Sequence, residues 1–302
     1  MADSLVQLGG TATRRREPKP EWLKVRMPGG GRYEHVKRTL RELNLHTVCE
    51  EASCPNVGEC WGGGTATVML MGDVCTRGCR FCDVNSGIPA PLDPSEPRHL
   101  AEAVGRLGLD YLVVTSVNRD ELPDGGASHF AQAIVELRRA APRTLVEVLT
   151  PDFQGSHDAL QMIVDAGPAV AAHNLETVAR LTPRVRDRRA TYRQSLEVLE
   201  FYKRSGMRTK SSLMLGLGET PDEVVQAMRD LRAVECDILT LGQYLRPSEK
   251  HLPVEEFVRP EEFAKLEREG LALGFRFVAA GPLVRSSYKA GEFFIQRWVG
   301  NG

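Results

Sequence analysis

The sequence predicts an α/β protein built on a parallel β-sheet, and two observations lead to this fold class. Six apolar runs of strand length alternate along the chain with segments whose apolar residues repeat at helical spacing. Near-continuous apolar strands joined by amphipathic helices are typical of a parallel sheet with helices outside. Polar residues also follow the ends of several runs, as they do at the catalytic rim of a parallel barrel. These positions favour a barrel over an open sheet.

The predicted strands cover residues 67–73, 110–117, 144–150, 169–176, 209–215 and 237–245, and a seventh apolar run covers 275–282. Helical spacing joins the apolar residues between them. Leu100, Val104 and Leu107, for example, share one helical face, and another helix covers residues 261–273.

The chain ahead of the first strand divides into different pieces. Residues 1–33 are rich in Arg, Pro and Gly, which predicts an extended basic arm. Apolar residues at i, i+4 and i+7 predict a short helix from Glu34 to Leu43. The cysteine-rich stretch that follows contains Pro and Gly and is interpreted as a loop. The predicted division is an arm at 1–33, a helix and cysteine loop at 34–66, a barrel at 67–282 and a tail at 283–302.

Composition excludes several classes of protein. The 302 residues carry 39 Lys and Arg against 40 Asp and Glu, a net charge of -1, which does not support a nucleic-acid binder. No run approaches the roughly 18 consecutive apolar residues of a membrane span. The first ten residues lack the charged-then-apolar layout of a secretory signal. We therefore expect a cytoplasmic protein whose thiols stay reduced.

The cysteines are concentrated in one part of the chain. Six of the seven lie between Cys49 and Cys82, in two groups of three. The second group, Cys75, Cys79 and Cys82, has the spacing CxxxCxxC directly after the first predicted strand. Zinc sites usually take four ligands in two pairs. Three thiolates on one tight loop suit instead a [4Fe–4S] cluster that keeps one iron open to another ligand.

The first group, Cys49, Cys54 and Cys60, also offers three thiols and needs a fourth ligand. The candidates for that position are Cys236, His35, His46 and a distant hydroxyl. Of these, Cys236 fits better as a buried thiol, because it lies where a predicted helix runs into the sixth strand.

The CxxxCxxC loop resembles that of the radical S-adenosylmethionine (SAM) superfamily. The resemblance implies that the open iron binds SAM and that one electron cleaves its C–S bond. The resulting 5′-deoxyadenosyl radical then abstracts hydrogen from an unactivated carbon. The implied fold is a partial (β/α)6 TIM-type barrel, in agreement with the strand count. SAM would lie along the strand ends, where the candidate contacts are Asn118, Asp120, Glu147, Asn174 and Glu176.

The two cysteine groups together make the resemblance more specific. The runs LHTVCEEASCPNVGECW and TATVMLMGDVCTRGCRFCDV resemble lipoyl synthases, as do NRDELPDGGA, HNLETV, LGLGET and the terminal RSSY. The similarity extends from Trp22 to Tyr288. It implies the insertion of two sulfur atoms at C6 and C8 of an octanoyl chain on a carrier lysine, with two SAM molecules consumed.

The same resemblance implies a second, auxiliary [4Fe–4S] cluster on the first cysteine group, and this cluster is the source of the sulfur. Its fourth ligand is a serine of the RSSY segment, placed at Ser287 with Ser286 as the alternative. A serine oxygen is a harder ligand than thiolate and binds iron less persistently. One weak ligand would help an iron depart as the cluster is consumed.

The implied partners are an octanoylated lipoyl carrier domain or carrier protein, an electron donor such as a ferredoxin or flavodoxin, and an iron–sulfur carrier for cluster repair. Two alternatives remain: another radical SAM sulfur-inserting enzyme, or a non-catalytic iron–sulfur carrier. The basic arm adds a hypothesis, because lipoyl-type carriers tend to be acidic around the modified lysine. The arm would then attract the carrier at long range, and the alternative is a solvated tail.

Overall fold

The computed structural model describes residues 19–25, 29–51, 54–287 and residue 298. Its main feature is an eight-stranded sheet with the order β1-β2-β5-β6-β7-β8-β9-β10. Every neighbouring pair from β2 to β10 is parallel, and the edge strand β1 is antiparallel to β2. The strands are β1 (His46–Thr47), β2 (Thr65–Leu70), β5 (Tyr111–Ser116), β6 (Leu145–Leu149), β7 (Val170–Ala172), β8 (Thr209–Leu215), β9 (Ile238–Gln243) and β10 (Phe277–Gly281), and a separate pair is β3 (Val74–Cys75) with β4 (Asn85–Ser86).

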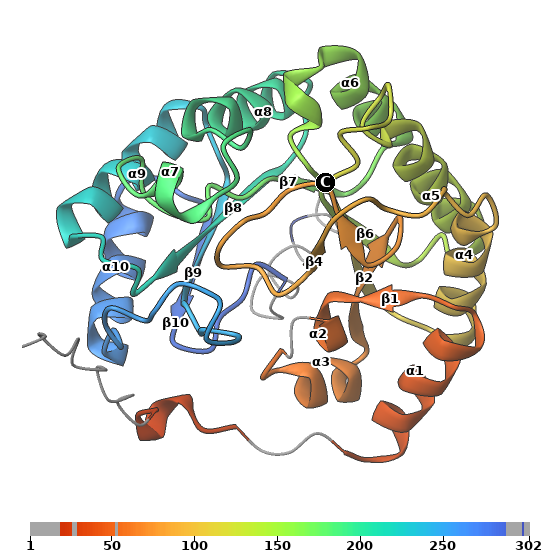
Figure 1. Ribbon diagram of the computed structural model, residues 1–302, viewed down its shortest axis with the longest axis horizontal. Helices are drawn as coiled ribbons and strands as arrows, with labels where there is room; N and C mark the ends of the chain where they lie inside the picture. The colour runs from red at the N-terminus through yellow and green to blue at the C-terminus, as the bar shows by residue number, and fades with distance from the viewer. Residues whose placement is uncertain (1–18, 26–28, 52–53, 288–297, 299–302) are drawn as a thin grey trace, which may run out of the picture.

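The sheet curves into a partial barrel with helices around its outside (Figure 1). β1 and β10 form its two edges, so within the described residues the sheet does not close into a ring. The expected partial barrel is confirmed, with β10 as a seventh parallel strand. The helices are η1 (Glu21–Leu23), α1 (Gly31–Glu42), α2 (Val48–Glu51), α3 (Val57–Gly63), α4 (Glu96–Leu107), α5 (Ala127–Ala140), η2 (Phe153–Gly155), α6 (His157–Ala166), α7 (Thr182–Val185), α8 (Tyr192–Arg204), α9 (Pro221–Ala233) and α10 (Pro260–Ala272).

All seven apolar runs form strands, but two of them, β2 and β7, end three and four residues earlier than predicted. β2 stops short of residue 73 because Met71 and Gly72 take left-handed φ values of 69° and 87°, which turn the chain out of the sheet. β7 has three residues, whereas the predicted strand covers 169–176. Beyond it Glu176 has a φ of 67° and makes an isolated bridge to β8. Both departures bring polar side chains to the barrel's rim.

The N-terminal region differs from the prediction in two places. α1 begins at Gly31 and not at Glu34, so the last three residues of the predicted arm are helical. The cysteine-rich stretch, interpreted as a loop, contains the helices α2 and α3. One of its glycines, Gly64, marks the end of α3 with a φ of 90°. Of the predicted arm, residues 1–18 and 26–28 lie outside the described residues.

Two large hydrophobic clusters fill the space between the sheet and the helices. One joins β2, β5 and β6 to α1, α4, α5 and α6, and the other joins β8, β9 and β10 to α9 and α10. They meet at β7 and α8, where Ala171 and Val198 belong to the first cluster and Leu199 belongs to the second. The two large clusters are therefore divided at the middle of the sheet, and a smaller cluster of Tyr111, Val113, Val170 and Ile238 lies across the division.

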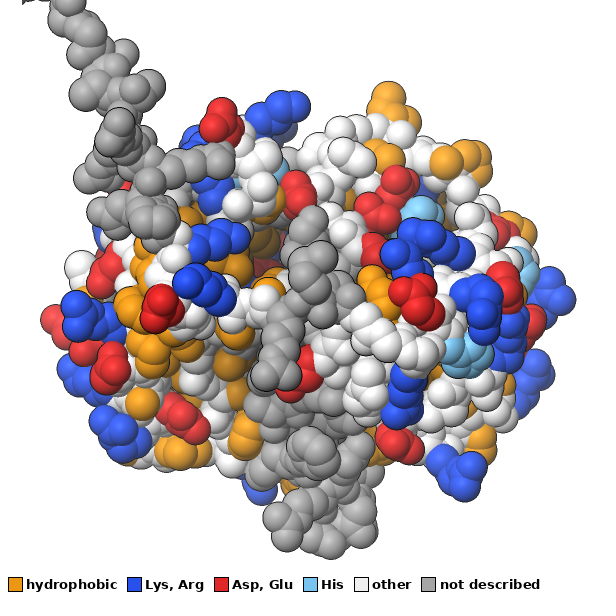
Figure 2. Space-filling model, turned by 90° about the horizontal axis from the view of Figure 1, so that it is seen from below, with side chains coloured by type: hydrophobic (Ala, Val, Ile, Leu, Met, Phe, Trp, Pro, Cys, Tyr) orange, Lys and Arg blue, Asp and Glu red, His pale blue; other side chains and the backbone are white. Residues whose placement is uncertain are grey.

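None of the helices within the described ranges is both long and apolar enough to cross a membrane. Figure 2 shows one face of the molecule, on which positive and negative side chains are interspersed and hydrophobic side chains gather on the left half. The mixture of signs agrees with the balanced charge of the sequence.

Candidate active site

A cavity of about 500 Å³ lies at the C-terminal ends of the strands, inside the partial barrel. Residues at the ends of strands from both halves of the sheet line it, among them Ser116 of β5, Leu149 of β6 and Gln243 of β9. Parallel barrels carry their catalytic residues at this end, and the volume suits a small-molecule ligand. The cavity is the candidate active site.

The second cysteine group lies on the loop between β2 and α4, and Cys75, Cys79 and Cys82 all line the cavity. Backbone N–H groups point at two of the sulfurs. The amides of Asn118 and Arg77 donate to Cys75 Sγ at 3.3 and 3.4 Å, and a third amide, from the loop after α7, donates to Cys79 Sγ at 3.3 Å. The amide that faces Cys79 lowers the pKa of that thiol and so opposes the effect of burial.

The donor set fits a [4Fe–4S] cluster. Burial raises the pKa of the Cys82 thiol to about 12 and also raises that of Cys79, so iron binding would displace protons from these sulfurs. No three His, Cys, Asp or Glu side chains in the described parts of the chain converge closely enough to surround a single metal ion. In a cubane cluster each thiolate binds a different iron, so separated thiols are the expected arrangement.

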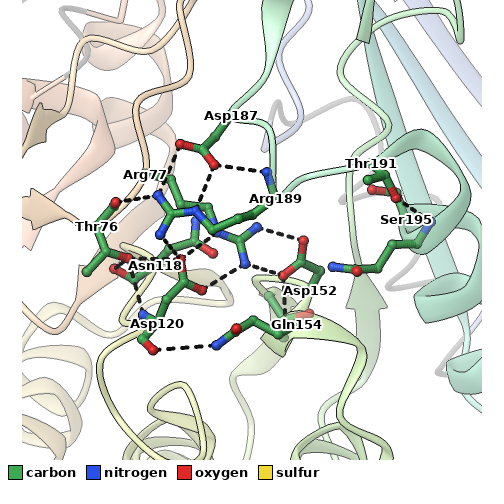
Figure 3. Close-up of polar contacts among 12 residues, drawn as sticks. Thr76, Arg77, Asn118, Asp120, Asp152, Gln154, Asp187, Arg189, Thr191 and Ser195 are labelled. Atoms are coloured by element: carbon green, nitrogen blue, oxygen red, sulfur yellow. Dashed lines mark hydrogen bonds and ion pairs between the residues drawn. The ribbon is translucent and has the colours of Figure 1, made fainter. Parts of the chain in front are cut away.

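The loop is held by a buried arginine from between the first two of its cysteines (Figure 3). Arg77 donates to both oxygens of Asp152 at 2.7 and 2.6 Å and to both oxygens of Asp120 at 2.8 Å. Asp120 follows β5 and Asp152 follows β6, so the arginine joins two strand ends to the loop. A cation shared by two carboxylates adds no net positive charge. Arg77 therefore positions the loop.

The first cysteine group lies on α2, α3 and the turn between them. Cys49 and Cys54 line the cavity, and Cys60 is buried on α3. Burial raises the pKa of Cys49 to about 12 and also raises that of Cys54. The C-terminal segment brings Ser286 and Ser287 to the same cavity.

Other candidate ligands for this group lie elsewhere. Cys236 is fully buried between α9 and β9, as predicted for a structural thiol, and does not line the cavity. His46 faces a smaller pocket and pairs with Glu51 at 3.5 Å. Tyr288 of the RSSY segment lies outside the described residues.

The predicted SAM contacts divide into two sets. Asn118, Asn174 and Glu176 line the cavity. Asp120 is engaged by Arg77 and is absent from the lining. Glu147 lies deeper, where Lys210 donates to both of its oxygens at 2.7 and 2.9 Å.

Glu147 is placed differently from the expectation because it sits in the middle of β6, not at its end. Its side chain is 1% exposed, and Tyr111 at the start of β5 also donates to it. The carboxylate therefore belongs to a buried pair within the barrel. The alternation of side chains along a strand, which decides this, is hidden in a continuous apolar run.

One residue of the cavity escaped the sequence analysis. Arg186 lines the cavity, is 8% exposed, and its Nε has no hydrogen-bond partner. Asn174 Oδ1 nearby is also buried without a partner. Burial raises the pKa of Glu176, an effect that Arg186 opposes. Arg186 and Asn174 both line the cavity, so their two unpartnered polar atoms are available to a ligand bound there. Arg186 lies in RVRDRR, and only the fold separates it from its exposed neighbours.

The fold and the site together define a class of protein, the radical SAM enzymes. Residues 69–231 match the radical SAM superfamily, and residues 5–54 match the N-terminal domain of lipoyl synthase of that family. The crystal structure of methylornithine synthase superposes with a TM-score of 0.57 at 14% identity, over 71% of this chain and 63% of that one. This likeness concerns the fold.

Two relatives show the family. The lipoyl synthase of Anaeromyxobacter sp. (strain Fw109-5) is 65% identical over 92% of this chain and 95% of its own. That of Thermus thermophilus is 58% identical over 95% of this chain and 91% of its own. The chain belongs to the lipoyl synthase family. It is a sulfur-inserting enzyme of the radical SAM class, with a [4Fe–4S] cluster and SAM as cofactors.

Proposed function

We propose that the chain converts a protein-bound N6-octanoyl-lysine to lipoyl-lysine by inserting sulfur at C6 and C8, with two SAM consumed and the sulfur taken from an auxiliary [4Fe–4S] cluster. The observation that carries the proposal is that the whole second cysteine group and two members of the first, Cys49 and Cys54, line one cavity of about 500 Å³. Hydrogens on C6 and C8 are not acidic, so a general base cannot remove them. A radical and a nearby sulfur source must meet in one space, and the shared cavity provides it.

Cys75, Cys79 and Cys82 would hold the SAM-cleaving cluster, which supplies one electron for reductive cleavage of SAM when it is bound. Their loop is fixed on both sides, since Arg77 attaches it to the strand ends and Asp187 accepts from the Gly78 amide at 3.0 Å. A fixed loop would keep the three thiols that hold the cluster in place at the wall of the cavity.

Asn118, Asn174, Glu176 and Arg186 would bind SAM. Arg186 offers a buried cation with a free Nε for a carboxylate. The Asn174 amide donates to Glu176 at 3.0 Å and leaves its own oxygen available to a donor such as an ammonium or hydroxyl. This set supersedes Asp120 and Glu147, whose carboxylates are satisfied within the protein.

Cys49, Cys54 and Cys60 would hold the auxiliary cluster, with Ser287 as the fourth ligand and Ser286 as the alternative. In this proposal residues 34–66 and 283–302 form one functional unit around the barrel of residues 67–282. This assignment is supported by the position of both serines, which line the same cavity as Cys49 and Cys54.

The proposed partners follow from the chemistry. They are an octanoylated lipoyl carrier domain or carrier protein as substrate, a ferredoxin or flavodoxin as electron donor, and an iron–sulfur carrier that rebuilds the consumed cluster. A reducing compartment such as the cytoplasm would keep the free cysteines available to iron. No nucleic acid or membrane is part of the proposal.

Triple substitution of each cysteine group by alanine tests the proposal. Anaerobically reconstituted protein should hold about eight irons, and each triple variant about four. Without Cys75, Cys79 and Cys82 the protein should make no 5′-deoxyadenosine. Without the first group it should still make 5′-deoxyadenosine and add no sulfur to an octanoyl-lysine peptide, as judged by mass spectrometry.

Cys236→Ala is the matched control, because this thiol is buried outside the cavity. It should keep both clusters and both products. Sulfur insertion by the first-group variant would overturn the proposed sulfur source. A wild-type protein that makes no 5′-deoxyadenosine would instead favour an iron–sulfur carrier.

A further inference from the structure

Asn56 attaches the first cysteine group to the segment that carries the two serines. Its Nδ2 donates to the Leu283 carbonyl at 2.6 Å, across 227 positions of sequence. Asn56 is 5% exposed, so solvent does not compete for the bond. Leu283 lies four residues before Ser287.

The backbone of the same residue contacts the cysteines. Asn56 occupies the N-cap of α3, where an asparagine side chain normally accepts from the helix's first amides, yet its side chain makes no such bond. Its backbone amide bonds to the Cys54 sulfur, and its carbonyl accepts from the Cys60 amide at 2.9 Å. One residue therefore connects two cysteines of the group to the C-terminal segment.

The segment is held on its other side by β9. A Cβ on Gly242 would lie 2.0 Å from the Val284 carbonyl oxygen, so the segment approaches a strand position that tolerates no side chain. Arg285 Nη1 donates to the Gln243 carbonyl at 3.3 Å. Residues 283–285 thus lie between the end of β9 and the start of α3.

We propose that Asn56 is a positioning residue for the serine ligand. Its bond fixes the segment of residues 283–287 in one register against Cys54 and Cys60, so that the hydroxyl of Ser287 meets the same group of thiols. The inference rests on the proposed role of that serine. A serine oxygen is a weak ligand for iron, and prior ordering of the segment reduces the entropy lost when the oxygen binds.

Asn56→Asp tests the proposal with an isosteric change. It keeps an N-capping residue and replaces the donor with an oxygen that faces the Leu283 carbonyl. Asn44→Asp is the matched control, because Asn44 is exposed and its φ of 53° suits Asp as well. In metal-free protein, amides of residues 283–287 should exchange with deuterium about tenfold faster in Asn56→Asp and unchanged in Asn44→Asp.

A double-substitution cycle with Ser287→Ala then separates positioning from general structure. In reconstituted enzyme, Asn56→Asp should lower the lipoyl product formed per 5′-deoxyadenosine about tenfold. In the Ser287→Ala background the same change should have no further effect. Equal product ratios in Asn56→Asp and wild type, or additive losses in the double variant, would overturn the inference.

Gly242→Ala perturbs the segment from the strand side and covers the case in which Asn56→Asp does not fold. In this variant the amides of residues 283–287 should also exchange faster with deuterium, and the lipoyl product formed per 5′-deoxyadenosine should again be low. Exchange as slow as in the wild type would contradict the proposal. Full sulfur insertion by Ser287→Ala would refute the serine's role in the proposed function. The exchange data on Asn56→Asp would still show whether the hydrogen bond from Asn56 to the Leu283 carbonyl orders residues 283–287.

Discussion

Replacing Asp152 with asparagine is expected to destabilise the protein strongly, because it removes one carboxylate from a buried ion pair. The side chains of Arg77 and Asp152 are 2% and 0% exposed. The asparagine has the same shape but no charge, and leaves the guanidinium with Asp120 alone. Removing one partner of a buried pair lowers the free energy of unfolding by about 3–5 kcal/mol.

The pKa of Asp152 determines the pH range in which the full effect can be measured. Burial opposes its ionisation, but the hydrogen bonds and charge of Arg77 outweigh burial and hold its pKa below the usual value. A lowered pKa stabilises the fold above the unfolded value near 3.9, and this stabilisation is lost only as the pH falls through the lower folded value. Measurements at neutral pH therefore report the full loss.

Anaerobic urea unfolding followed by circular dichroism is the assay. With a slope of about 3 kcal/mol/M, the midpoint should fall by about 1–2 M. Asp120→Asn should cost less, because Asp120 is 11% exposed and partly solvated. Asp158→Asn, on the exposed N-terminal turn of α6, should change the unfolding free energy by less than about 1 kcal/mol. Equal midpoints for Asp152→Asn and Asp158→Asn would refute the reasoning.

Three further predictions concern other parts of the chain. Glu147→Gln leaves the Lys210 ammonium buried without a counter-charge. The substitution should lower the free energy of unfolding by about 3–5 kcal/mol and leave the KM for SAM unchanged. A raised KM for SAM in a stable variant would show that Glu147 contacts SAM after all. Burial lowers the pKa of His173 from 6.5 to about 4, so between these pH values the unfolded chain binds the proton more readily. Unfolding free energy should fall by up to about 3 kcal/mol on acidification through this range, and His173→Gln should flatten that dependence in urea titrations. Deleting residues 1–20 should raise the KM for an intact octanoylated carrier, and the increase should be smaller at high salt. The KM for a short octanoyl-lysine peptide should not change. Equal kinetics of the truncated and full-length enzymes on the intact carrier would contradict the docking role of the arm.

Most of the barrel could be predicted from the sequence because buried parallel strands and amphipathic helices leave strong local patterns. The pattern does not contain β1, which has two residues. It also misses α6, whose buried face relies on small residues, Ala159 and Ala166, beside Leu160 and Ile163. The chain beyond the early end of β7 includes Glu176 in a left-handed backbone conformation, which the residue types there do not predict.

The cysteines of the site could be predicted because their spacing is local, whereas contacts between distant segments could not. Arg77 stands in the predicted motif, but its partners are 43 and 75 positions away. Arg186 is one of several arginines in a row, and only packing directs it inward. Asn56 resembles an ordinary helix cap in the sequence, and its partner lies near the other end of the chain. Long-range pairing of this kind leaves no periodic signal.

The division of the core at β7 has a consequence for folding. β7 pairs with β6 through three residue positions and with β8 through two, whereas β8 and β9 share six. Each half of the barrel therefore has its own large hydrophobic cluster, and the two halves are joined by few strand pairs and by a small third cluster of Tyr111, Val113, Val170 and Ile238. We expect such halves to open at different free energies. Because the cavity is lined by both halves, a ligand bound there favours the state in which they are joined, by mass action. We therefore expect cofactor loading to strengthen the coupling between the two halves of the barrel.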